Sequence, residues 1–264
     1  MSPLNPTPAA RMPCLFMGHG SPMNALEDNV YTRAWRQLAL DIPKPRAILC
    51  ISAHWHIPGT ALTANARPET IHDFGGFPPA LHTAQYPAPG SDALVAQCMS
   101  LLRASHARAR MDWGLDHGAW SVLAQMYPHA DIPVVQLSMS RSLSPADHFA
   151  MGQALQPLRD DGVLILGSGN LTHNLRYAMS TGPGPTAPWA ANFDAECTQA
   201  LQARDFDFLM RAPETPEGRM AHPTAEHYLP LLYVAGASTE DDAVRFLCEG
   251  MEFSSLSMRC VRLG

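Results

Sequence analysis

Three histidines in separate parts of the chain each follow a short apolar run. They are His19 after residues 14–17, His54 after residues 47–51, and His173 after residues 163–166. Apolar runs of this length, bounded by glycine or proline, are typical of buried strands. Ligands of open α/β sheets bind beyond the carboxyl ends of the strands. Since neutral imidazole is a good ligand for zinc, iron and copper, these histidines predict one metal centre at that edge of a sheet.

The second of these histidines belongs to an H-x-H pair, His54 and His56. On a regular strand both side chains would share one face. If the strand ends at residue 53, His56 falls at the rim of the site instead. We therefore assign the metal to His54 and expect no function for His56.

A fourth cluster, in residues 221–230, places Glu226 beside His227, and Thr224 could cap the helix that carries them. Adjacent helical residues point about 100° apart, so we expect one of the two to bind the metal and the other to support it. Two histidines with a carboxylate are typical of non-haem Fe(II) oxygenases. An all-histidine set fits zinc at least as well, so the cluster leaves both metals open.

His117 lies between Asp116 and Gly118, in a turn ahead of a predicted helix. It could cap that helix or lie on the surface without a function. It could also transfer protons, because an unperturbed imidazole titrates near neutral pH. Spacing alone leaves both interpretations open. Of the remaining histidines, His72 and His222 are close enough to the site segments to be candidates for supporting residues.

The elements that must position these residues alternate along the first two thirds of the chain. Helices are predicted at 31–40, 91–105, 119–126 and 144–158, strands at 47–51, 60–64, 134–137 and 163–166, then helices at 189–202, 206–210 and 227–235 and a strand at 258–263. This alternation predicts an α/β fold, with a central mixed β-sheet flanked by helices and the metal site at the carboxyl ends of strands. Residues 13–264 are expected to form one domain, after a flexible, proline-rich N-terminal tail at 1–12.

Residues 66–90 are too long for an ordinary connection. Segments of this length are usually either lids over a site or disordered. This one contains Phe74, Phe77 and Tyr86, so we expect it to pack as a wall over the metal site and to contact the substrate.

Composition excludes several classes of partner. Of 264 residues, 46% are hydrophobic and 16% charged, which indicates a globular protein, and the net charge of -6 without a basic stretch argues against nucleic acid. No apolar run approaches the roughly 20 residues that span a membrane, and the first residues lack the features of a signal peptide. The six cysteines form no C-x-x-C pair, so we expect reduced thiols and a cytoplasmic location. No pattern indicates an oligomeric state.

Motifs for phosphate and nicotinamide chemistry are absent from the sequence. It contains neither a P-loop nor a dinucleotide-binding glycine motif, and it lacks H-E-x-x-H and G-x-S-x-G. Phosphate and nicotinamide chemistry are therefore not expected.

Together the motifs resemble those of a known family, the class III extradiol ring-cleavage dioxygenases, in the branch of the DOPA 4,5-dioxygenases. The resemblance runs from about residue 13 to the C-terminus. Five segments carry it in order, MGHGSP at 17–22, ISAHW at 51–55, LDHGAW at 115–120, GSGNLTHNL at 167–175 and HPTAEHYLP at 222–230.

The resemblance implies metal ligation by His19, His54 and His227. It places His173 beside the metal, as a further ligand or an acid–base group, and makes His117 a second acid–base residue. Glu226 and His222 would then support the ligands. Other members of the class use a glutamate as third ligand where this branch uses a histidine, so ligand type alone does not select Fe(II). The resemblance implies Fe(II) for activity, with Zn(II) able to occupy the isolated protein.

One segment departs from the family pattern. The family loop reads close to Tyr-Asp-Phe-Tyr-Gly-Phe-Pro, whereas residues 72–78 read HDFGGFP. Two aromatic hydroxyls are missing from a predicted substrate wall that includes His72, Phe74 and Phe77. A site built around particular hydrogen bonds discriminates strongly between analogues. The departure weakens the case for DOPA itself as the substrate.

The implied reaction is the opening of a catechol-type ring by O2 at a mononuclear non-haem metal. Two other functions fit the same histidines. A zinc hydrolase could use them to activate water. A non-catalytic metal-binding protein could keep the fold for interaction alone.

Overall fold

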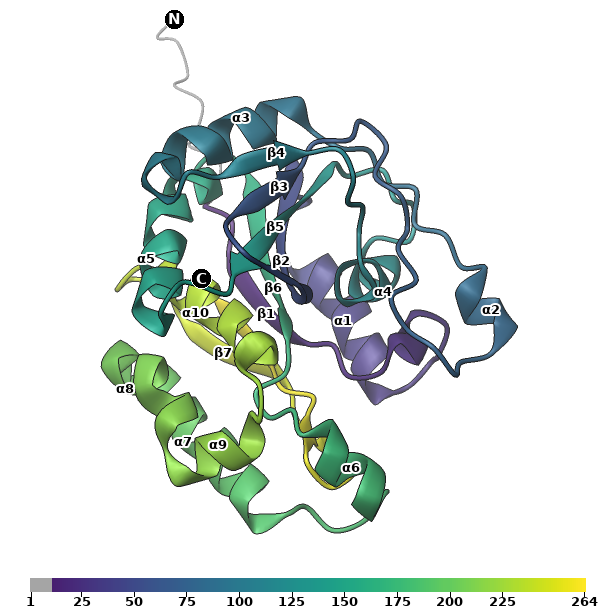
Figure 1. Ribbon diagram of the computed structural model, residues 1–264, viewed down its shortest axis with the longest axis vertical. Helices are drawn as coiled ribbons and strands as arrows, with labels where there is room; N and C mark the ends of the chain where they lie inside the picture. The colour runs from purple at the N-terminus through teal and green to yellow at the C-terminus, as the bar shows by residue number, and fades with distance from the viewer. Residues whose placement is uncertain (1–10) are drawn as a thin grey trace, which may run out of the picture.

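The apolar runs form the centre of an eight-stranded mixed sheet in the computed structural model, which describes residues 11–264 (Figure 1). The sheet order is β4-β3-β5-β2-β6-β1-β10-β7. Its strands are β1 (Cys14–Gly18), β2 (Ala47–Ile57), β3 (Ala61–Thr63), β4 (Arg108–Arg110), β5 (Val134–Ser140), β6 (Val163–Gly169), β7 (Val244–Cys248) and β10 (Cys260–Leu263). The four central strands β5, β2, β6 and β1 are mutually parallel, so their carboxyl ends share one edge.

Helices cover both faces of the sheet (Figure 1). They are α1 (Val30–Asp41), α2 (Pro79–His82), α3 (Asp92–Leu101), α4 (His117–Met126), α5 (Pro145–Leu155), α6 (Leu175–Thr181), α7 (Pro188–Ala203), α8 (Phe206–Arg211), α9 (Pro216–Ala221) and α10 (Leu229–Gly236). Short 3-10 turns occur at Pro22–Ala25, Arg103–Ser105, Gln156–Arg159, Ala212–Glu214 and Ala225–His227, and a small hairpin pairs β8 (Met251–Glu252) with β9 (Leu256–Ser257).

Alternate residues of the central strands divide the apolar core into two layers. Leu15 and Met17 of β1 pack on the side of α1 and α4, where they meet Trp35 and Trp120. Phe16, between them, packs on the side of α5 and α10. Burial of both faces explains why these strands read as continuous apolar runs in the sequence. The α/β fold with a mixed sheet flanked by helices is confirmed.

Several elements differ from the sequence-based prediction. The strand predicted at 47–51 continues to Ile57, and the helix predicted at 227–235 begins at Leu229, after a 3-10 turn that contains His227. Helices α2, α6 and α9 and strands β4, β7, β8 and β9 were not predicted. They are short, and β4 has the sequence Arg-Ala-Arg, so none carries a clear apolar period.

The last two residues of the predicted tail, Arg11 and Met12, lie in the described part of the chain. Residues 1–10 lie outside the described part of the chain. Arg11 forms an ion pair with Asp160 at 2.6 Å, and Met12 is buried, with its backbone N–H donating to the carbonyl of Arg159 at 3.0 Å. The structured region therefore includes Arg11 and Met12.

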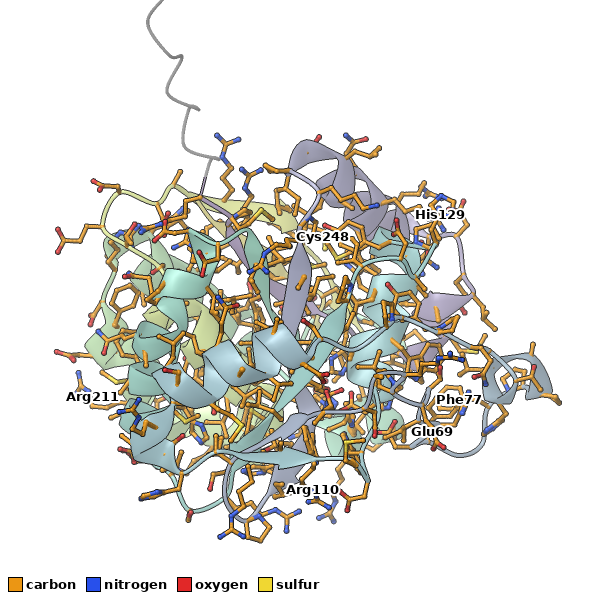
Figure 2. The ribbon with its side chains drawn as sticks, turned by 90° about the horizontal axis from the view of Figure 1, so that it is seen from above. Glu69, Phe77, Arg110, His129, Arg211 and Cys248 are labelled. Atoms are coloured by element: carbon orange, nitrogen blue, oxygen red, sulfur yellow. The ribbon has the colours of Figure 1, made fainter. Side chains whose placement is uncertain are left out.

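The 66–90 segment packs against the body of the protein, as predicted. Tyr86 is buried and donates a hydrogen bond to the carbonyl of Tyr127, and Ile71 binds the backbone of Leu115. Figure 2 shows Glu69 and Phe77 of this segment together at one side of the molecule. Within residues 11–264, no helix is long and apolar enough to cross a membrane.

Candidate metal centre

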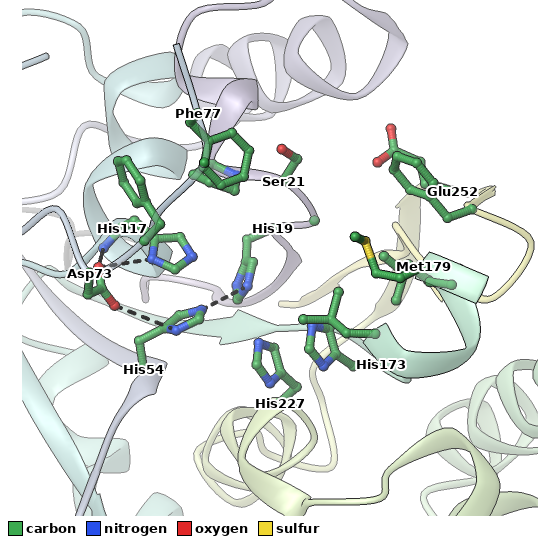
Figure 3. Close-up of a pocket in the computed structure, with 18 of the residues that line it drawn as sticks. His19, Ser21, His54, Asp73, Phe77, His117, His173, Met179, His227 and Glu252 are labelled. Atoms are coloured by element: carbon green, nitrogen blue, oxygen red, sulfur yellow. Dashed lines mark hydrogen bonds and ion pairs between the residues drawn. The ribbon is translucent and has the colours of Figure 1, made fainter. Parts of the chain in front are cut away.

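Three histidines from distant parts of the chain converge at the edge where the parallel strands end (Figure 3). His19 directly follows β1, His54 lies in β2, and His227 ends the 3-10 turn before α10. One ring nitrogen from each lies within 4.8 Å of the others. The Nε2 atoms of His19 and His54 are 3.3 Å apart. Two nitrogens bound tetrahedrally to one metal at the usual bond length would be separated by about 3.3 Å, so the pair fits a shared ion.

The hydrogen bonding of His19 leaves one nitrogen free to bind a metal. Ser168, in β6, donates its hydroxyl proton to the carbonyl of Gly118 at 2.5 Å. The same oxygen lies 2.9 Å from Nδ1 of His19 and must therefore accept a hydrogen bond from the N–H at Nδ1. This tautomer puts the lone pair of His19 on Nε2, which faces His54. A partner on the other ring nitrogen is the usual arrangement of histidine ligands.

The three imidazoles are held neutral, as metal binding requires. Burial and the nearby imidazole of His117 together lower the pKa of His54 to about 3, against the opposing attraction of Asp73. Burial and the neighbouring imidazoles hold the pKa values of His19 and His227 well below the ordinary value. Nδ1 of buried His227 has no hydrogen-bond partner among residues 11–264. Three neutral imidazole nitrogens, two of them fully buried and that of His54 half-buried, fit a divalent zinc or iron ion.

Close backbone packing holds two of these histidines in place. A Cβ on Gly118, in the first turn of α4, would lie 2.9 Å from Cδ2 of His54 and would also collide with the hydroxyl of Ser52. A Cβ on Gly169, at the end of β6, would collide with the carbonyl of His227. Both positions therefore require glycine, because a larger residue would displace a histidine of the cluster.

His117 is the first residue of α4 and forms a pair with Asp73 of the 66–90 segment. One carboxylate oxygen of Asp73 accepts from the backbone N–H of His117 at 3.0 Å and lies 2.9 Å from its Nδ1. An ionised carboxylate can only accept, so Nδ1 carries the proton and Nε2 has a free lone pair. The other oxygen of Asp73 is 3.6 Å from Nδ1 of His54. Burial alone would raise the pKa of Asp73, but its bonds to His117 hold it below the ordinary value.

Asp116 fixes the start of α4 from below the site. It is fully buried and caps the helix at the N–H of Ala119. Its carboxylate also accepts hydrogen bonds from the hydroxyl of Ser52 at 2.6 Å and from the side-chain amide of Gln136. Burial raises its pKa to about 6, with the charge of Asp73 adding to the effect. The sequence motif contains Asp116, but no local pattern reveals that it contacts β2 and β5.

His173 lies beside the cluster. Its ring stacks on His227 with centroids 3.4 Å apart and planes 6° apart, and it lines the same cavity. Burial, with a contribution from His222, lowers its pKa to about 4. Among residues 11–264 the converging nitrogen set consists of His19, His54 and His227 without His173, which favours an acid–base function for His173 over ligation.

The cavity above the histidines has a volume of about 620 Å³. Its walls include Phe74 and Phe77, as predicted from the sequence, and residues that the sequence analysis missed: Ser21, Asp73, Leu175, Ala178, Met179, Glu252, Phe253 and Leu256. Those after residue 174 belong to α6 and the β8–β9 hairpin, whose short elements gave no sequence signal.

The structure places His72, which the sequence analysis expected in the substrate wall, outside the cavity lining. Nε2 of His72 lies 2.9 Å from the carbonyl of Ala84, and the ring packs near Trp120 outside the cavity lining. His56 also lies outside the lining. His222 binds the carbonyl of Leu171 at 2.8 Å behind the site, and Glu226 has an oxygen 3.4 Å from Nδ1 of His227. Both positions suit residues that support the histidine cluster.

Comparisons with known proteins show what this chain is similar to in sequence and fold. The family model described as the catalytic LigB subunit of aromatic ring-opening dioxygenase matches residues 13–263. The chain is 47% identical over 260 residues to a 4,5-DOPA dioxygenase extradiol of Escherichia coli (strain K12), covering 97% of this chain and 96% of that relative. It is 39% identical over 240 residues to a 4,5-DOPA dioxygenase extradiol of Beta vulgaris, covering 88% and 89%. A crystal structure of an uncharacterized protein from Escherichia coli K12 has a TM-score of 0.85 at 43% identity, covering 96% of this chain and 100% of that one.

Proposed function

The chain belongs to the LigB family of aromatic ring-opening dioxygenases, and we propose that it opens a catechol ring at one Fe(II) ion held by His19, His54 and His227. Membership makes it an oxidoreductase of the extradiol ring-cleaving type. The observation that carries the proposal is the convergence of three neutral imidazoles next to the His117–Asp73 pair in one cavity.

Bound Fe(II) would supply the redox chemistry that lets a catechol react with O2, which zinc lacks. The protein's own residues position the ring and move its protons. Phe74 and Phe77 offer an apolar wall for the ring, and the histidines lie at the floor of the cavity. The product is a semialdehyde acid that contains both atoms of O2, so no external reductant is needed.

We assign the first proton transfer to His117. Asp73 holds the proton on Nδ1, so Nε2 can accept the proton of a catechol hydroxyl. The imidazolium that forms would be stabilised by the carboxylate 2.9 Å away. The same nitrogen can then return the proton to an oxygen as the ring opens. His173 is neutral because burial lowers its pKa to about 4, and we assign it the second proton transfer because it lines the same cavity.

The test is reconstitution of the metal-free protein with Fe(II) under anaerobic conditions, followed by addition of catechols and O2. We expect O2 uptake together with the absorbance of a yellow product, and neither with the zinc-loaded protein. Hydrolysis of a substrate by the zinc form without O2 would replace this proposal with the zinc hydrolase. Metal binding without any turnover would favour the non-catalytic alternative.

We also propose a cytoplasmic location. All six cysteines are buried free thiols among the described residues. Structural thiols that stay reduced are typical of proteins of a reducing compartment.

A further inference from the structure

The half-buried carboxylate of Glu252 is part of the cavity wall, on the other side from Asp73 and His54 (Figure 3). Around it the wall is apolar, with Met179, Phe253 and Leu256. A volume near 620 Å³ is in the range that holds drug-sized ligands, so the cavity has room for a catechol with a side chain. A ring at the histidines would direct that side chain into the space that Glu252 borders.

The charges of the lining are one-sided. All the lining residues are described, and they include no lysine or arginine. The two acids are Asp73, already bonded to His117, and Glu252. An anionic side chain on the substrate would find no opposite charge in this wall, whereas a cationic one would find a carboxylate.

Glu252 has no partner of its own. Within residues 11–264, no side chain donates a hydrogen bond to its carboxylate or forms an ion pair with it. Arg259, from the same C-terminal segment, is already bound to Asp194 at 2.6 Å and Glu249 at 3.2 Å. Burial raises the pKa of Glu252, and the nearby carboxylate of Glu27 raises it further. A partly desolvated carboxylate without a counterion is unfavourable, and a bound cation would offset that cost.

Strand pairing and a hydrogen bond fix the backbone around Glu252. Glu252 pairs with Leu256 across the β8–β9 hairpin, so both side chains lie on one face of it. The turn between them places two non-glycine residues, Phe253 and Ser254, at φ of 45° and 64°. Such conformations persist only where the surroundings impose them. Here the hydroxyl of Ser254 donates to the carbonyl of Gly182 at 2.9 Å.

We propose that Glu252 selects catechols whose side chain carries a positively charged amine, and disfavours those whose side chain carries only a carboxylate. This inference rests on the proposed ring-opening function. The ammonium of the substrate would donate a hydrogen bond to the carboxylate of Glu252 while the catechol oxygens face His19, His54 and His227. Glu252 is thus a specificity-determining residue for the substrate's side chain.

The test compares four catechols of different charge on the Fe(II)-loaded enzyme. They are dopamine, DOPA, dihydroxyphenylpropionate and the neutral methylcatechol. A hydrogen bond to a charged group contributes enough that Glu252→Gln should lower kcat/KM for dopamine about tenfold. The change for methylcatechol should stay within about twofold of wild type, because methylcatechol has no charge to pair. Glu252→Lys should shift the preference toward dihydroxyphenylpropionate.

The matched control is Glu249→Gln, which removes a carboxylate from the same segment but outside the cavity lining. It should leave the substrate order unchanged. If Glu252→Gln changed kcat/KM equally for dopamine and methylcatechol, the inference on Glu252 would be overturned, whereas the proposed ring-opening function would not be affected. Failure of every catechol to react would instead refute the proposed function. Dopamine binding to Glu252→Gln and to Glu249→Gln, measured by anaerobic calorimetry, would still test Glu252, since binding does not depend on turnover.

Discussion

Replacing Ser168 by alanine tests whether the metal affinity depends on the residue behind His19. In the native protein the Ser168 oxygen accepts the proton of His19 Nδ1 and donates to the carbonyl of Gly118. Alanine leaves a buried N–H without an acceptor, which costs about 1–3 kcal/mol. It also removes the constraint on the tautomer, so the ring can carry its proton on Nε2, where it cannot bind a metal. Loss of such an outer partner typically lowers metal affinity by about 10–100-fold.

The assay separates metal affinity from stability. Competition with a chelator would measure Zn(II) and Fe(II) affinity, and urea unfolding of the metal-free protein would measure stability. The matched control is Ser138→Ala in β5, because Ser138 is equally buried and its oxygen accepts from the backbone of Ala61 at 2.8 Å, away from the histidines. Both variants should lose stability, but only Ser168→Ala should lose metal affinity. Equal metal affinity in the two variants would refute the assignment of the His19 tautomer.

Four further predictions follow from the site. His117→Gln should keep the metal but lower kcat by about 10²–10⁴-fold in steady-state kinetics, because glutamine cannot carry the proton. Gly75→Tyr, at a lining position with open space for a side chain, should change the relative kcat/KM among catechols, whereas His72→Tyr should not. Gly118→Ala should lower metal affinity in the chelator assay by about tenfold through its collision with His54, although alanine favours a helix. The folded pKa of His54, about 3, lies below its unfolded value of about 6.5. The unfolded chain therefore binds more protons between these values, so the free energy of unfolding of the metal-free protein should decrease as the pH is lowered across this window. Urea unfolding at several pH values would measure this slope, which should be smaller in His54→Gln.

Much of the fold and the core of the candidate site could be predicted because their signals are local. A buried parallel strand must be apolar on both faces, and a residue directly after it must lie at the carboxyl edge of the sheet. His19 obeys this rule, since it follows β1 by one residue. Five short motifs in a fixed order then indicated the family, and the family match confirms it.

The parts that could not be predicted depend on contacts between distant segments. Asp73 and His117 are 44 residues apart and meet because the 66–90 segment folds back on the start of α4. No periodic sequence pattern predicts the course of the 66–90 segment. Its irregular backbone also turns His72 away from the cavity, although the neighbouring Asp73 faces inward. Glu252 was missed for a related reason, because a two-residue strand is too short to show an alternating pattern.

The H-x-H pair shows how one irregularity of the sheet separates two residues that regular geometry would keep together. Ile51 of β2 pairs with Leu137 of β5, and His56 pairs with Met139, so β2 has more residues than β5 between these two pairs. The extra residues form a bulge, which leaves His54 unpaired with β5 and free to turn toward the metal site. The strand then resumes at His56, whose side chain does not line the cavity. Strand alternation would place both histidines on one face, and a strand ending at residue 53 would place His56 at the rim. The bulge instead brings a single candidate ligand from a strand that continues past it, which explains why one imidazole of the pair enters the cavity.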